Sequence, residues 1–290
     1  MDVMTVVDDA AKARPLPVRT LRWHPAQRRS ARPRRRGRAL DLAVRALVPV
    51  ALLAAWQLVA SLGWVDPQVL PGPLVIVDAY AELLRTGELQ AALPVSLQRA
   101  GIGLAIGGGT GLLLGVAAGL WAAAERLYDA PLQMLRTIPF IAMVPLFIVW
   151  FGIGEESKIA LIVGASIFPV YLNTYHGIRG IDRRLIELAQ TFELSRRQVI
   201  GLIVVPLAMP QILVGLRYAA GTALLALVAA EQINTVSGIG YILNNANQNQ
   251  RTDIIIAGIL VYAALGIVVD VLMRLLEKAL LPWRLTHDGK

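Results

Sequence analysis

The chain has 290 residues, of which 56% are hydrophobic and only 17% are charged, and its mean hydropathy is +0.58. A water-soluble globular protein needs more polar surface than this composition provides. The absence of cysteine excludes disulfides, thiolate zinc sites, iron–sulfur clusters and cysteine nucleophiles, and three scattered histidines argue against a histidine metal cage. The composition therefore indicates a membrane protein without a metal site.

Positive charge is concentrated at the N-terminus. Residues 1–38 hold eleven Lys or Arg against three Asp, whereas the remainder holds seventeen basic and seventeen acidic residues. Residues 1–39 interleave arginines with prolines and cannot form a core, so we expect a disordered cytoplasmic tail. Its charge favours contact with anionic membrane lipid, with a regulatory or nucleic-acid role as the alternative. The neutral remainder gives no reason to expect nucleic-acid binding by the body of the protein.

Apolar stretches long enough to cross a membrane recur along the chain. A helix crosses the roughly 30 Å of hydrocarbon with about 20 mostly apolar residues. Six stretches approach this length: residues 43–62, 101–121, 132–151, 159–178, 206–230 and 254–273. They are continuous apolar runs, whereas the strands of a membrane barrel alternate in polarity. The sequence therefore predicts an all-α membrane protein with six transmembrane helices within residues 40–285, followed by a C-terminal end at residues 286–290.

The distribution of Lys and Arg predicts the orientation of these helices, because cytoplasmic loops are enriched in both. With the N-terminus inside, the cytoplasmic face collects the basic tail and most other basic residues outside the spans: Arg126, Arg179, Arg183, Arg184, Arg196, Arg197, Arg274, Lys278, Arg284 and Lys290. The opposite face receives only Arg85, Arg99, Lys158 and Arg251. We therefore expect both termini in the cytoplasm. The first apolar run follows a leader too long for a signal peptide, so we expect it to be a retained anchor.

Glycine recurs at every fourth residue of the second predicted span, at Gly103, Gly107, Gly111, Gly115 and Gly119. In lipid, such ridges of small residues let helix backbones approach closely and gain van der Waals contact. A phosphate-binding glycine loop is the alternative, but no Gly-Lys-Ser or Gly-Lys-Thr follows and no strand precedes the series. We therefore predict that this helix packs at the centre of the bundle.

Prolines interrupt the later spans: Pro139 and Pro145 lie in the third, Pro169 in the fourth, and Pro206 and Pro210 at the start of the fifth. Each lacks a backbone N–H and loosens its helix locally, which membrane proteins tolerate beside protein or a wet cavity. Such sites are typical of transport pathways, although an ordinary packing kink explains any single one.

Motifs of hydrolytic catalysis are missing. The sequence has no Gly-x-Ser-x-Gly, no His-Glu-x-x-His and no paired carboxylates within the spans of the kind that proton-coupled carriers use. Asp270 and Arg274 in the last span are four residues apart, which predicts an ion pair on one helix face. We therefore expect no catalytic residue in this chain.

A polar segment, residues 179–205, separates the fourth and fifth spans. Gly180 and Asp182 predict the start of a helix, and Ser195 predicts the cap of a second short helix. Between them, apolar side chains recur at helical spacing, namely Leu185, Leu188, Ala189 and Phe192. Such an amphipathic helix can bind a partner protein or lie on the lipid surface, and the pattern alone leaves both readings open.

The same segment resembles part of a known family. Glu187, Leu188 and Ala189 are followed by Pro206, seventeen residues after Ala189. This pattern resembles the EAA loop of permease subunits of bacterial ABC importers, where the loop is a coupling helix that docks in a groove of the cytoplasmic ATPase. The family pattern has Gly six residues after the Glu, and this chain has Glu193 there. Because a Cβ is costly where φ is positive, the alternative is a helix that continues through Glu193.

The resemblance extends over about 240 residues, essentially everything after the tail. Residues 132–159, 168–182 and 237–246 (SGIGYILNNA) resemble the aliphatic-sulfonate permeases, whose close relatives carry taurine, nitrate, bicarbonate or pyrimidine precursors. The resemblance implies a type I ABC importer permease fold and a small anionic organosulfur compound, an aliphatic sulfonate, as cargo. The other cargoes remain alternatives, as does an ATPase-independent secondary transporter.

The resemblance also implies an assembly in the cytoplasmic (inner) membrane. A permease of this kind pairs with a second copy of itself, two ABC ATPase subunits and an extracytoplasmic substrate-binding protein. ATP and Mg are held by the ATPase, and the permease itself carries no cofactor. The polar outer segments 66–90 and 232–253 would form the platform for the binding protein, with loops that only join helices as the alternative. The implied coupling residues are Glu187 as the charged contact and Leu188, Ala189 and Phe192 as the apolar plug. Four arginines would flank them or simply keep the surface solvated: Arg183, Arg184, Arg196 and Arg197.

A sulfonate is a permanent anion, so its path should offer hydrogen-bond donors without a trapping charge. The polar candidates near the spans are Arg136, Tyr171, Asn173, Arg217, Thr222 and Gln232. Snorkelling of Arg136 toward the membrane surface, and interhelical hydrogen bonds of Asn173 and Thr222, are the structural alternatives.

Overall fold

The computed structural model describes residues 35–233 and 235–281, which form helices and connecting turns without a strand. The helices are α2 (Arg35–Ser61), α3 (Pro73–Arg85), α4 (Glu88–Leu120), α5 (Ala122–Leu135), η1 (Phe140–Met143), α6 (Val144–Phe151), α7 (Glu155–Arg179), α8 (Arg183–Thr191), α9 (Arg196–Val199), η2 (Ile200–Val204), α10 (Val205–Glu231), α11 (Ile239–Gln248) and α12 (Thr252–Leu280). The chain from Leu53 onward forms one compact unit, and the start of α2 belongs to another. The predicted tail up to residue 34 and the C-terminal end, residues 286–290, lie outside the described residues.

Four of the described helices are long and apolar enough to cross a membrane: α4, α7, α12 and the run Arg196–Glu231 that contains α10. In hydrocarbon a helix is stable because it satisfies its backbone hydrogen bonds internally. These four match the second, fourth, fifth and sixth predicted spans. The first predicted span falls on α2, of which the stretch Leu47–Ser61, where the described side chains begin, is a shorter apolar helix. The all-helical prediction is confirmed, and the described residues contain four spanning helices, or five with a broken pair, against the six predicted.

The third predicted span is not one continuous helix: the helices of this region, Ala122–Leu135 and Phe140–Phe151, form either a broken span or a re-entrant loop. α5 ends at Leu135, and the following segment, η1 and α6, is bent by 90° from it. Pro139 is the physical cause, because it disfavours a helical conformation at Ile138 and has no N–H to donate. Pro145 is tolerated in the first turn of α6, where an N–H would have no helical partner.

The glycines of α4 form its contact with α7. A Cβ built on Gly107 would lie 2.5 Å from the carbonyl oxygen of Val163, and one on Gly115 would lie 2.8 Å from that of Tyr171. The remaining glycines of the series are equally crowded by α7: Gly103, Gly111 and Gly119. Backbones at this separation gain van der Waals contact that larger side chains would prevent.

Helix α7 also packs along α10, so that α4, α7 and α10 form the centre of the unit. A Cβ on Gly215 of α10 would lie 3.0 Å from the carbonyl oxygen of Pro169. Ala219, Ala223 and Ala226 on α10 are almost completely buried. Small residues therefore line both sides of α7.

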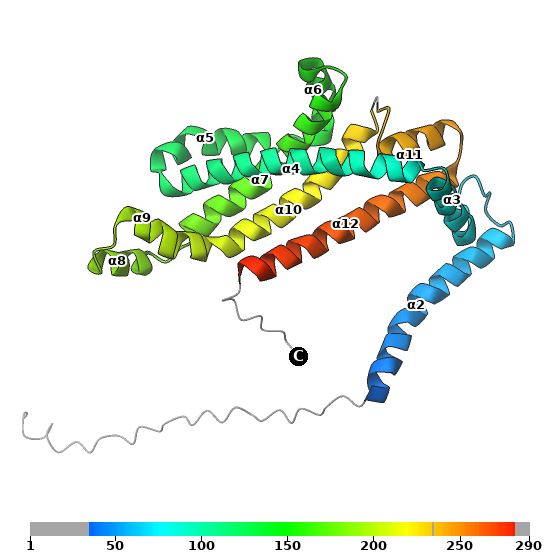
Figure 1. The fold of residues 1–290 in the computed structure, drawn as a ribbon, viewed down its shortest axis with the longest axis horizontal. Helices are drawn as coiled ribbons and strands as arrows, with labels where there is room; N and C mark the ends of the chain where they lie inside the picture. Colours follow the sequence, from blue (N-terminus) through cyan, green and yellow to red (C-terminus); the bar gives the residue numbers. More distant parts are fainter. Residues whose placement is uncertain (1–34, 234, 282–290) are drawn as a thin grey trace, which may run out of the picture. The chain divides into compact units, whose positions relative to one another are not determined.

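The two ends of the helical unit carry different elements, as Figure 1 shows: α8 and α9 lie where α7 ends and α10 begins, whereas α3 and α11 lie at the opposite end. At that opposite end, α3, α11, α12 and the start of α4 share an apolar core that includes Leu83, Leu89, Ile239, Leu243 and Val261. The unit thus has a loop with several arginines at one end and an apolar core at the other.

Candidate functional site

The loop between α7 and α10 contains two short helices whose ends are capped as the sequence predicts. The side chain of Asp182 accepts a hydrogen bond from the backbone N–H of Arg184 at 2.9 Å, at the start of α8. Ser195 and Gln198 form a reciprocal capping box at the start of α9. Caps of this kind satisfy backbone donors that have no partner within the helix. Both predicted caps are therefore confirmed.

The turn between α8 and α9 passes through Glu193, whose φ is +53°. The alternative of a helix continuing through Glu193 is wrong, because α8 ends at Thr191. This left-handed conformation is the one that glycine adopts without strain, and a residue with a Cβ adopts it at a cost of about 1–2 kcal/mol. The chain therefore keeps the turn geometry without the glycine of the family pattern.

We expect Glu193→Gly to raise the free energy of unfolding by about 0.5–1 kcal/mol, because relief of the strain exceeds the extra entropy of an unfolded glycine. Gln190→Gly is the matched control: it lies in α8 and should lower stability by about 0.5–1 kcal/mol. Thermal unfolding of the purified chain in detergent measures both. Equal destabilisation by the two substitutions would contradict the strain at Glu193.

The outward side of this loop is an apolar groove of about 430 Å³, lined from α8, the turn, η2 and the start of α10. Phe192 is 70% exposed and Leu188 is 53% exposed, whereas Ala189 is buried at the groove floor. Glu187 lies on the exposed surface and pairs weakly with Arg183 at 3.4 Å. Large exposed apolar side chains beside charged ones are typical of a protein-binding surface.

The π-helix η2 joins this loop to α10. The backbone N–H of Val205 donates to the carbonyl of Ile200, five residues back, instead of the usual four. Pro206 follows immediately and cannot donate to the carbonyl of Leu202, so the wider turn accommodates its ring. Loop and span are therefore continuous in structure.

A second site lies in the bend of the broken third span. Its cavity, of about 540 Å³, lies between α5, η1, α6, α7 and α10. Arg136 and Thr222, two of the predicted path residues, both line it. The guanidinium of Arg136 lies 5.4 Å from the ring centroid of Phe168, within cation–π range. Its volume is within the range of small-molecule sites, roughly 300–1,000 Å³.

The other predicted path residues do not line this cavity. Tyr171 is buried and donates to Asp129 at 2.6 Å, and Asn173 accepts a hydrogen bond from Gln211 of α10 at 2.9 Å. Gln232 follows the end of α10 and is exposed. Arg217 forms ion pairs with Asp270 and Glu277, and the predicted pair of Asp270 with Arg274 is present, at 2.9 Å. These residues hold helices together or lie at their ends.

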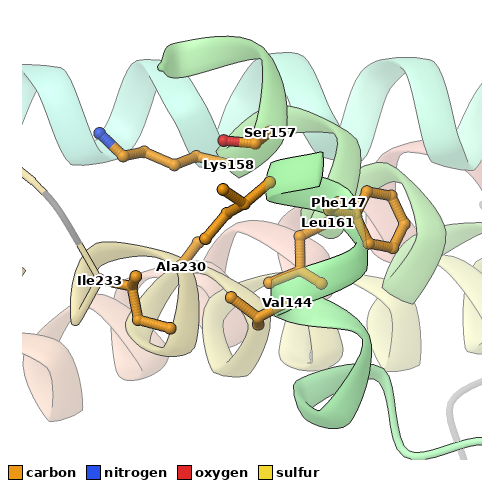
Figure 2. A pocket seen from close by; sticks show the side chains of 8 residues that line it. Val144, Phe147, Ser157, Lys158, Leu161, Ala230 and Ile233 are labelled. Atoms are coloured by element: carbon orange, nitrogen blue, oxygen red, sulfur yellow. The ribbon is translucent and has the colours of Figure 1, made fainter. Parts of the chain in front are cut away.

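A smaller pocket beside α6, α7 and α10, shown in Figure 2, has a volume of about 20 Å³. Apolar side chains, among them Val144, Leu161 and Ile233, form much of its wall, with Ser157 and Lys158 beside them. Lys158 is buried and pairs with Glu155 at 3.2 Å. This space holds about one water molecule, so no organic cargo fits here.

A buried ionic cluster lies at the end of the unit opposite α8. The side chain of Arg99 is 2% exposed and that of Glu231 is fully buried, with Arg99 Nη1 2.7 Å from Glu231 Oε1. Arg99 Nε also lies 2.6 Å from Glu155 Oε2. Glu231 further accepts hydrogen bonds from Ser96 at 2.7 Å and Tyr262 at 2.8 Å. A buried charge pair is tolerable only when its remaining hydrogen-bonding groups are satisfied, as here.

The same cluster fixes the start of α11. The backbone N–H of Gly240 donates to Glu231 at 2.9 Å, and that of Ile239 donates to the Ser96 hydroxyl at 2.9 Å. Arg99 Nη1 donates to the carbonyl of Ser237 at 2.7 Å. Sequence reasoning missed this cluster and treated Arg99 as a charge of the outer face. The sequence signal that could have indicated this cluster is the Ser-Gly-Ile-Gly segment at residues 237–240, because its small residues let the backbone approach the buried carboxylate of Glu231.

Arg251 lies between α3 and α12, at 2.7 Å from Glu82 and 2.9 Å from Asp253. The hydrogen bond with Asp253, followed by that with Glu82, raises the pKa of Arg251 above its ordinary value.

Among the described residues no group of three or more His, Cys, Asp or Glu side chains is placed to hold a metal ion.

Comparison with known proteins places these features in a family. Residues 111–282 match the family described as binding-protein-dependent transport system inner membrane component. The chain is 44% identical over 243 residues to the putative aliphatic sulfonates transport permease protein SsuC of Bacillus subtilis, covering 84% of this chain and 88% of that protein. The protein of the same name from Escherichia coli is 45% identical, covering 84% and 92%. The taurine transport system permease protein TauC of Escherichia coli is 33% identical, covering 80% and 86%.

Solved structures give the same architecture. A structure of the MetNI methionine ABC transporter in an inward-facing conformation matches 65% of this chain and 95% of its own, with a TM-score of 0.54 and 16% identity. A second crystal form gives a TM-score of 0.52 at 19% identity. At this identity the likeness shows the fold, which is that of an ABC importer permease.

Proposed function

The chain belongs to the family of binding-protein-dependent transport system inner membrane components, and from this premise we propose that its cargo is an aliphatic sulfonate. The support is the similarity itself: relatives named for aliphatic sulfonates are 44% and 45% identical, against 33% for the one named for taurine. Taurine, nitrate, bicarbonate and a pyrimidine precursor are the alternative cargoes of the same machinery.

The proposed assembly contains two copies of this chain, two ABC ATPase subunits that bind ATP and Mg, and an extracytoplasmic binding protein. Both termini and the α8–α9 loop face the cytoplasm, in keeping with the basic residues of residues 179–205. The binding protein docks at the end that carries α3 and α11. The chain itself catalyses no reaction.

Coupling to the ATPase takes place through α8. Phe192 and Leu188 insert into the ATPase groove, and Glu187 makes the charged contact, flanked by exposed Arg184 and Arg196. The supporting observation is that these side chains are all exposed, and that α8 and α9 lie where α7 ends and α10 begins (Figure 1). Because η2 joins this loop to α10 without a break, displacement of the loop reaches the centre of the unit.

We expect Glu187→Lys to lower ATP-driven uptake about ten-fold or more, which corresponds to about 1.4 kcal/mol of lost docking free energy. The substitution places a lysine ammonium against the ATPase surface that, in this proposal, binds the Glu187 carboxylate. Glu156→Lys, at an exposed carboxylate in the first turn of α7 and outside the proposed docking segments, is the control and should transport normally. Uptake and ATP hydrolysis are measured together in proteoliposomes; unchanged uptake by Glu187→Lys would remove α8 from the coupling role.

Ligand-dependent ATP hydrolysis tests the cargo. The reconstituted complex is supplied with its own binding protein, loaded in turn with an alkanesulfonate, taurine, nitrate or a pyrimidine. We expect the alkanesulfonate to stimulate hydrolysis most, and another winner would reassign the cargo. Uptake by this chain alone on an ion gradient, without ATP, would instead identify a secondary transporter.

A further inference from the structure

The cavity in the bend of the broken span has one charged group on an otherwise uncharged wall. Fifteen described residues line it, and Arg136 is the only one of them with a charge. The others are mostly apolar, and include Ile138, Phe140, Met143 and Trp150. Such a wall matches a ligand that is anionic at one end and apolar along the rest of its length.

Arg136 is free to bind such an anion. Its guanidinium forms no ion pair or hydrogen bond with any described residue, and its contact is with the ring of Phe168. Thr222, the hydroxyl on the same wall, already donates to backbone carbonyls, with the oxygen of Ala165 at 3.0 Å. A hydroxyl has a single proton to donate. Arg136 is therefore the strong donor of the cavity.

The acidic residues of α5 that could neutralise Arg136 are engaged elsewhere. Asp129 accepts from Tyr171 at 2.6 Å, and Glu125 accepts from Tyr175 at 2.5 Å. These two hydrogen bonds also fasten α5 to α7. The helix that ends directly before Arg136 is thus anchored, and the guanidinium has a defined place at the bend.

We propose that Arg136 holds the sulfonate head of the cargo in this cavity and that the apolar wall holds its alkyl chain, so that the permease itself selects aliphatic sulfonates. This inference rests on the proposed function. Each methylene group buried against an apolar wall strengthens binding roughly four-fold. Taurine carries an ammonium group on its short chain, and burying that charge without a partner is costly. The cavity therefore favours butanesulfonate over both taurine and methanesulfonate.

The head-group contact is tested in proteoliposomes that contain the full complex and its binding protein. We expect Arg136→Met to lower butanesulfonate uptake at least ten-fold, while hydrolysis stimulated by the loaded binding protein continues. Arg136→Lys should recover part of the uptake because it keeps the charge but loses the bidentate geometry. Arg126→Met, at an exposed arginine of α5 without a described ion pair, is the control and should transport normally.

The apolar wall is tested with Ile138→Ser, which places a hydroxyl on the wall, and with Ile141→Ser, which lies outside it. Uptake of methanesulfonate and butanesulfonate is compared in each variant. We expect the preference for butanesulfonate to fall several-fold in Ile138→Ser and to persist in Ile141→Ser. An equal preference in wild type and Ile138→Ser would overturn the assignment of the wall.

Failure of this inference differs from failure of the proposed function. If wild-type complex takes up no sulfonate with ATP, the cargo is wrong. If wild type transports sulfonates and Arg136→Met transports them equally well, the cargo stands and the head-group site is overturned. Dissociation of the Arg136→Met complex on size-exclusion chromatography would also overturn it, because the residue would then act in assembly.

Discussion

Replacing Arg99 by Met should lower the free energy of unfolding by about 3–5 kcal/mol, the cost of leaving one member of a buried ion pair without its partner. Glu231 is fully buried and would lose the cation that faces it, whereas Glu155 is half exposed and would remain in contact with water. The loss should appear as a lower unfolding temperature in detergent and as lower yield from membranes.

Two further variants separate charge from packing at this site. Arg85→Met removes an exposed arginine from α3 and should leave stability within about 0.5 kcal/mol of wild type. The double variant Arg99→Met with Glu231→Gln removes both charges and should recover part of the loss, as a double-mutant cycle would reveal. No recovery in the double variant would mean that the shape of Arg99, rather than its charge, stabilises the cluster.

Gly107→Leu should prevent α4 and α7 from packing and leave little folded protein. A Cβ at this position would lie 2.5 Å from a backbone oxygen of α7, which cannot move aside as a flexible side chain can. Overpacking in a well-packed interior costs roughly 1–3 kcal/mol for an added methylene or two, and a leucine adds more volume than that.

Gly109→Leu is the matched control for this substitution. It lies two residues further along the same helix, is exposed, and would have no atom within 4 Å of its Cβ. Both substitutions improve helix propensity by about the same amount, so any difference reports packing. Protease resistance and monodispersity in detergent measure the folded fraction, and similar behaviour of the two variants would contradict the close approach of α4 and α7.

The features that the sequence predicts well are those whose cause is local. Examples are the four-residue spacing of the glycines in α4 and the helix caps at Asp182 and Ser195. Each pattern depends only on residues that are close in sequence, so no tertiary contact is needed to recognise it. The Arg99 cluster is the opposite case, because Glu155 lies 56 residues and Glu231 lies 132 residues away along the chain. Only folding brings these groups together.

The bend at Pro139 shows an intermediate case. The prolines of the third span are plain in the sequence, but a proline in a membrane helix gives a slight kink in one setting and a full break in another. Arg136 and Thr222 are likewise recognisable as polar candidates, yet their meeting in one cavity depends on the 90° bend. Mean hydropathy over residues 132–151 does not detect the break at Pro139, so the sequence predicts one continuous span there.

The hydrogen bond between Glu231 and the start of α11 restricts how the helices of this end can move. One carboxylate links the end of α10 to α4 through Ser96 and Arg99, to α12 through Tyr262, and to the amide of Gly240. Sliding any one of these helices alone would break at least one hydrogen bond of this buried carboxylate, which is costly. If α8 is pulled, as the proposed coupling requires, we expect this end of the helical unit to move as one rigid block, with its four helices still joined at Glu231.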